Sequence, residues 1–181
     1  MSTRGSIAPD REAARRAADR ERSRPPVSSD PRFEAVRRGQ VGSAVPVSSP
    51  DGAPAFWLVP FELDGRACGV ARVELTSAVS QIATFGSGPA DRGAWPEASF
   101  FEHPPPALVA QAAERHPTLE SSTARLSYDG TPAKWGWRID TRPGEFEDPP
   151  LPGQEGTVVF ITPGGWYARA VRRAAGANRE G

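Results

Sequence analysis

Apolar and polar residues alternate along three successive stretches in the first half of the chain, which predicts three strands. The first stretch is residues 56–63, where large apolar side chains occupy every second position, and this period of two is typical of a half-buried strand. Asp64-Gly65 follows, and this dipeptide favours the positive backbone angles of a two-residue hairpin turn. Residues 66–75 and 79–85 repeat the alternation, so the three strands are expected to form a meander.

A single main helix is predicted after this meander. Pro104-Pro105-Pro106 favours a helix start, because proline loses no hydrogen bond in the first helical turn. Residues 107–116 then place apolar side chains at helical spacing, and Pro117 ends the pattern. Since the apolar stripe consists largely of small residues, the helix can lie close against a sheet.

The second half of the chain returns to the strand pattern. Residues 124–128 and 135–139 alternate on either side of a short turn, and residues 157–162 form the continuous apolar run of a central strand. The predicted order is therefore βββ-α-βββ. It corresponds to an α+β domain over residues 55–167, with an antiparallel sheet of about six strands and one helix packed on one face.

The two flanks differ from this domain in composition. Residues 1–54 are polar and rich in Ser, Pro and Gly, and predict a disordered or extended arm and linker with one short helical turn near residues 33–38. Residues 168–181 predict a basic tail. The formal net charge is zero, yet residues 56–167 carry eight basic and 14 acidic side chains. The flanks hold the opposite excess, which favours contact with the domain itself or with an acidic partner.

Composition excludes several classes of function. No stretch approaches the roughly 18 consecutive apolar residues of a membrane span, and the first 50 residues contain no apolar run of a secretory signal. Cys68 has no partner for an internal disulfide, so a cytoplasmic, reducing location is expected. The chain lacks glycine-rich phosphate loops in a strand–turn–helix context. Acidic residues interrupt its arginine-rich arm, so nucleic acid is not the expected partner.

Few residues could support catalysis or bind a metal. His103 and His116 bracket the predicted helix, about 20 Å apart at a rise of 1.5 Å per residue, and so cannot share a metal ion. His103, beside Glu102, is the one acid–base candidate. The acidic stretch of residues 145–155 lacks the pattern of a calcium loop and is interpreted as solvated. We therefore predict no metal, no other cofactor and no enzymatic activity.

Two segments resemble a known class of small domains. Residues 107–139 (ALVAQAAERHPTLESSTARLSYDGTPAKWGWRI), preceded by residues 56–76 (FWLVPFELDGRACGVARVELT), are similar to the PepSY and cystatin-like class. Members of this class place one helix before a hairpin, and often serve as regulatory, inhibitory or accessory modules. The resemblance spans about half of the chain and implies an accessory role.

These observations predict a non-enzymatic domain that binds another protein, as an accessory, inhibitory or immunity-type module in a bacterium. Its expected anchors are exposed aromatic side chains: Trp95, Phe100, Phe101 and Trp166. Tryptophan is enriched where binding energy concentrates, although the same side chains could cover the domain's own core. Two alternatives stay open. One is a ligand-binding or catalytic pocket between the helix and the Trp135/Trp137 face, and the other is a structural subunit of a larger assembly.

Overall fold

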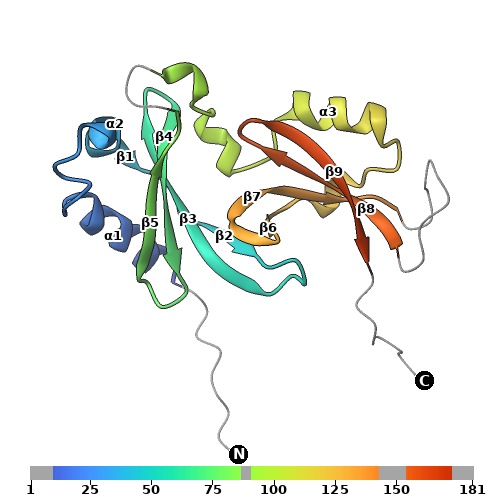
Figure 1. The fold of residues 1–181 in the computed structure, drawn as a ribbon, viewed down its shortest axis with the longest axis horizontal. Helices are drawn as coiled ribbons and strands as arrows, with labels where there is room; N and C mark the ends of the chain where they lie inside the picture. The colour runs from blue at the N-terminus through green and yellow to red at the C-terminus, as the bar shows by residue number, and fades with distance from the viewer. Residues whose placement is uncertain (1–9, 87–90, 143–153, 173–181) are drawn as a thin grey trace, which may run out of the picture.

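Figure 1 shows the computed structural model of the chain, which describes residues 10–86, 91–142 and 154–172. The described residues form three α-helices, α1 (Arg11–Arg22), α2 (Glu34–Arg38) and α3 (Pro106–Arg115). They also form nine strands: β1 (Gln40–Val41), β2 (Val45–Ser48), β3 (Pro54–Leu63), β4 (Arg66–Glu74), β5 (Val79–Thr84), β6 (Arg125–Asp129), β7 (Thr131–Asp140), β8 (Gln154–Thr162) and β9 (Gly165–Arg172). Short 3₁₀ turns lie at Pro31–Phe33, Arg92–Ala94, Ala98–Phe101 and Ser121–Thr123.

All nine strands belong to one open sheet. Eight of them follow the order β5-β4-β3-β2-β6-β7-β8-β9, and β1 pairs with β3. Every pairing is antiparallel except that of β2 with β6, which run parallel and meet at Ser48 and Ser127. This junction joins an N-terminal group of strands to a C-terminal group, and β5 and β9 form the two edges of the sheet (Figure 1).

Two buried cores hold the helices against the sheet. In the first core α1 and α2 pack on β3 and β4, and in the second core α3 packs on β8 and β9 (Figure 1). Strand β3 contributes to both, because Trp57 and Val59 face α1 while Leu58 faces the second core. A strand buried on both faces explains why apolar residues occupy nearly every position of residues 56–61.

The α+β class is confirmed, and most predicted elements appear close to their expected bounds. The turn between β3 and β4 has positive φ at Asp64 (53°) and Gly65 (76°), as the dipeptide predicts. Leu63 pairs with Arg66 across it. The prediction of a purely antiparallel sheet of about six strands with one main helix is wrong, because the described residues already form nine strands, a parallel junction and three helices.

The missing elements come from the N-terminal flank. The prediction of a disordered or extended arm is wrong for most of residues 10–54, which contain α1, α2, β1 and β2. Asp10 caps α1 by accepting hydrogen bonds from the backbone N–H groups of Glu12 and Ala13 at 3.0 and 3.1 Å. The expected helical turn near residues 33–38 is confirmed.

The alanines of α1 supply the physical reason for this correction. Ala14, Ala17 and Ala18 are buried against the sheet, and their small side chains let the helix backbone approach the strands closely. The C-terminal flank needs a similar correction, because residues 168–172 continue β9 along β8 instead of beginning a tail. The acidic stretch of residues 145–155 and the rest of the basic tail lie outside the residues whose side chains the structure describes.

Candidate functional site

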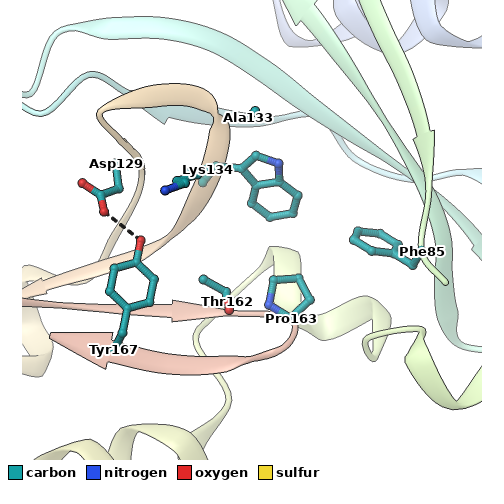
Figure 2. Close-up of a pocket in the computed structure, with 8 residues that line it drawn as sticks. Phe85, Asp129, Ala133, Lys134, Thr162, Pro163 and Tyr167 are labelled. Carbon is teal, nitrogen blue, oxygen red and sulfur yellow. Dashed lines mark hydrogen bonds between the residues drawn. The ribbon is translucent and has the colours of Figure 1, made fainter.

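A cleft of about 610 Å³ opens between the two groups of strands. Three segments far apart in the sequence line it: the end of β5, the β6–β7 hairpin and the β8–β9 hairpin. Figure 2 shows Phe85 on one side of this cleft, with Asp129, Lys134 and Tyr167 on the other side and Pro163 below. The cleft therefore forms where segments from both groups of strands come together.

The floor of the cleft is aromatic. Trp135, which is half-buried, packs against Phe85, Phe100 and Phe101, with ring centroids 6.4, 6.3 and 5.8 Å away. Aromatic pairs prefer the tilted and edge-on arrangements seen here, and such contacts restrain each ring. The cleft thus presents part of a fixed indole ring together with the Phe85 ring and the Pro163 side chain.

A hydrogen-bonded ion pair occupies one wall. The Tyr167 hydroxyl donates to Oδ2 of Asp129 at 3.0 Å (Figure 2). The Arg169 guanidinium pairs with Oδ1 of the same carboxylate. Burial, followed by the hydrogen bond to Asp129, raises the pKa of Tyr167 to about 12. Tyr167 is therefore protonated at neutral pH, and both oxygens of Asp129 are already engaged.

The ammonium group of Lys134 is a charge of the cleft that a ligand could reach. Its side chain is exposed and has no hydrogen-bond or ion-pair partner among the described residues. An ammonium group beside an aromatic floor favours a ligand that combines an apolar part with an anionic group. The neighbouring Asp129 opposes this preference little, because Arg169 compensates its charge.

A smaller hollow of about 140 Å³ adjoins the cleft and shares Phe85 and Trp135 with it. Its other lining includes Arg72 of β4 and Gln81 of β5, facing the tip of the β6–β7 hairpin. Arg72 donates to Ser80 Oγ at 2.8 Å and lies 5.8 Å from the centre of the Phe56 ring. The lining extends the cleft along β5 and places Arg72 at its far end, where Glu74 pairs with its guanidinium at 3.5 Å.

The predicted anchors mostly lie inside the protein. Trp95, Phe100 and Phe101 are 4%, 3% and 3% exposed, so these side chains cover the protein's own cores, which is the alternative left open by the sequence. Trp166 is half-buried and meets the His116 ring edge-on at 6.0 Å. The structure therefore does not bring the four together as one exposed surface.

The other singled-out side chains lie away from the cleft. His103 is exposed, and its Nδ1 lies 3.4 Å from the Pro104 carbonyl oxygen. Cys68 is buried in β4, as expected for a small apolar residue, and contacts the Phe61 carbonyl oxygen at 3.1 Å. Burial raises the pKa of its thiol to about 11. Neither residue adds a reactive group to the cleft lining.

Side chains of the second core pack below α3. Trp137 donates its indole N–H to the Phe100 carbonyl oxygen at 2.6 Å, and Ala112 of α3 packs into the same core beside Ile139. The open alternative places a pocket between the helix and the Trp135/Trp137 face. Of these two tryptophans, Trp135 lines the cleft and Trp137 does not.

An acidic hollow of about 310 Å³ is lined by α1, β1, the end of β3 and the 3₁₀ turn at Ala98–Phe101. Burial and the negative charge of Glu102 raise the pKa of Glu62 there. Arg15 of α1 also lines this hollow and donates to the Val41 carbonyl oxygen at 3.2 Å. In the described ranges, no three His, Cys, Asp or Glu side chains are grouped so that they could hold a metal ion.

Of the residues that line the cleft, sequence reasoning singled out only Trp135, as part of a possible pocket below the helix. Asp129 and Lys134 belong to a predicted hairpin, Phe85 ends a predicted strand, and Tyr167 is the last residue of the predicted domain, so each has an ordinary structural explanation in the sequence. Their convergence depends on pairings between distant strands. The one available signal is Lys134, the single lysine among 22 basic residues.

Comparison of this chain with protein-family models, curated proteins and solved structures finds no match. Of the helices found in the described residues, none combines the length and the apolar character needed to cross a membrane.

Proposed function

We propose that this protein is a non-enzymatic binding module that holds an acidic segment of another protein in the cleft. The observation that carries this proposal is the exposed ammonium of Lys134, which has no partner in the part of the chain that the structure describes, beside the apolar surface of Phe85, Trp135 and Pro163. Such a surface matches a segment in which a carboxylate lies next to an aromatic or aliphatic side chain, because charge supplies orientation and apolar burial supplies affinity.

The ionisable groups of the cleft support binding better than catalysis. A general base needs a carboxylate or imidazole free to accept a proton, whereas Asp129 already accepts the Tyr167 hydrogen bond and the Arg169 ion pair. The pKa of about 12 leaves Tyr167 without the anionic form that could act as a nucleophile at neutral pH. The resemblance of residues 56–76 and 107–139 to PepSY and cystatin-like domains agrees with an accessory or inhibitory role, and the single unpaired cysteine agrees with a cytoplasmic location.

Selection of random 12-residue peptides by phage display on the full chain tests the proposal. We expect enrichment of peptides that pair Asp or Glu with an aromatic or large aliphatic residue. The exchange Lys134→Glu should weaken their binding by about tenfold or more, since it replaces an attraction by a repulsion of similar size. Isothermal titration calorimetry of one enriched peptide measures this change.

Arg11→Glu is the matched control. Arg11 is an exposed arginine in the first turn of α1, away from the cleft lining, so this variant has the same net charge as Lys134→Glu. Equal losses of affinity in the two variants would indicate a nonspecific charge effect and would contradict the proposal. A selection without any enriched peptide would contradict it as well.

A small-molecule ligand is the second candidate, because the volume of about 610 Å³ lies within the ~300–1,000 Å³ typical of ligand pockets. Aromatic carboxylates combine the two required features in one molecule. The change in the melting temperature of the protein on addition of phenylacetate or indole-3-acetate measures such binding and distinguishes this candidate from peptide binding. Saturable stabilisation by these acids without any peptide binding would favour it over the protein-binding proposal.

A further inference from the structure

We propose that the partner segment binds as an additional strand along the outer edge of β5, so that alternate side chains of the segment enter the cleft. This inference rests on the proposed function and adds the mode of recognition. In strand addition, backbone hydrogen bonds supply affinity and pockets for every second side chain supply specificity. Three features of β5 support it.

The first feature is that β5 presents a free edge. It pairs with β4 on one side, and no described backbone group bonds to its other side. Natural proteins protect such edges with proline, with charged side chains or with a covering segment. The β5 sequence VSQIAT contains neither proline nor charge, whereas β9, at the opposite edge, carries Arg169. The β5 edge is therefore the one better suited to pairing.

The second feature is the direction of its backbone groups. The Phe85 N–H donates to the Cys68 carbonyl oxygen at 3.0 Å, and hydrogen-bonded pairs alternate along an antiparallel ladder. The backbone N–H and C=O groups of Gln81 and Ala83 therefore point toward β4. The backbone N–H and C=O groups of Ile82 and Thr84 point outward and are available to an incoming strand.

The third feature is the position of the cleft relative to this edge. Gln81, Ala83 and Phe85 all line the cleft or the adjoining hollow. A strand added beside β5 lies about 4.8 Å away and carries its own alternate side chains on the same face. These side chains continue the row of Gln81, Ala83 and Phe85, opposite the β6–β7 hairpin that carries Lys134. The best occupant is thus an extended segment with acidic and apolar residues at alternate positions.

Proline substitution at an outward-facing position tests this mode with the peptides enriched on the full chain. Thr84→Pro removes an outward N–H and leaves the β4 ladder intact, so peptide binding should weaken by about tenfold, through the lost bond and the steric bulk of the ring. Thr84→Val keeps the N–H and should bind as the unmodified protein does. Ala170→Pro makes the corresponding change on the exposed edge of β9 and should also leave binding unchanged.

The outcomes separate this inference from the proposed function. Loss of binding in Lys134→Glu, with full binding in Thr84→Pro, would overturn strand addition and leave the cleft proposal intact. Loss in Ala170→Pro instead of Thr84→Pro would place the segment on β9 and would also overturn it. Failure to enrich any peptide would overturn both. An alanine scan of one bound peptide should show sensitivity at every second residue, and sensitivity with a helical period would contradict an extended segment. Urea unfolding of each variant shows whether it is folded.

Discussion

Two features of the cleft wall affect the ionisation of Tyr167: the partial burial of its side chain and its hydrogen bond to Asp129. Both favour the neutral phenol, and they raise its pKa from 10.0 to about 12. Because the folded-state pKa is the higher one, the associated stabilisation is complete below about pH 10 and is lost as the pH rises through about 12. We expect ultraviolet titration of the folded protein to show one tyrosine ionising well above its ordinary range.

The Tyr167→Phe variant assigns that titration. It keeps the aromatic ring, including the stacking on Phe160 at 5.5 Å, and removes the hydroxyl, so the late titration step should disappear. The other tyrosine of the chain is Tyr128, which this variant leaves unchanged. Ionisation of Tyr167 near pH 10 in the folded protein would show that neither its partial burial nor its hydrogen bond to Asp129 persists in solution.

The individual aromatic residues also show how far sequence can locate a site. The hydrophobicity of Phe100, Phe101 and Trp95 predicts that they avoid water, and they do so inside the protein. The side chain of Trp135 is equally hydrophobic, but part of it is exposed to the cleft. Residue type alone does not distinguish these cases, because exposure depends on which strands surround each ring.

Helix α1 depends on small side chains for its position on the sheet. Ala18 is fully buried between the helix and the strands, so a larger side chain must displace its neighbours. We expect Ala18→Leu to lower the free energy of unfolding by about 1–3 kcal/mol, the usual cost of overpacking. Urea denaturation measures this difference.

The same substitution on the exposed side of the helix is the control. Arg20→Leu lies two residues later, where the side chain faces solvent, and should change the unfolding free energy by no more than about 0.5 kcal/mol. Equal effects at the two positions would mean that α1 is not docked in solution and that the N-terminal flank behaves as the sequence predicts.

The elements recovered from the sequence share one property, a sufficiently long periodic pattern. Strands β3, β4 and β7 have 10, nine and 10 residues, and helix α3 was located to within one residue at each end. Strands β1 and β2 have two and four residues, which is too short for a period to be recognised. They form because β3 offers them an edge, and this information is not local.

The junction between the two groups of strands determines the shape of the whole molecule. Ser127 is fully buried there, and its hydroxyl donates to the Ser48 carbonyl oxygen at 3.0 Å. Phe56 and Tyr128 stack across the same junction with ring centroids 6.1 Å apart. These contacts join strands that lie far apart in the sequence.

We expect Ser127→Ala to destabilise the protein by about 1 kcal/mol, because the substitution removes one buried hydrogen bond and leaves the carbonyl with less compensation. Thermal and urea unfolding measure the loss. Ser122→Ala provides the control, since Ser122 is exposed and has no side-chain hydrogen bond in the described structure. An unchanged stability in Ser127→Ala would show that the junction is held by the stacked rings and by strand pairing alone.

The sequence by itself determined the α+β class, the tight turn at Asp64-Gly65, helix α3 and most strands, because each depends on the spacing of residues close together in the chain. Only the tertiary structure decided that α1 is docked, that β2 and β6 join two groups of strands, and that Phe85, Lys134 and Tyr167 line one cleft. The physical reason is that these features arise from pairings between distant segments, whose geometry no local pattern encodes.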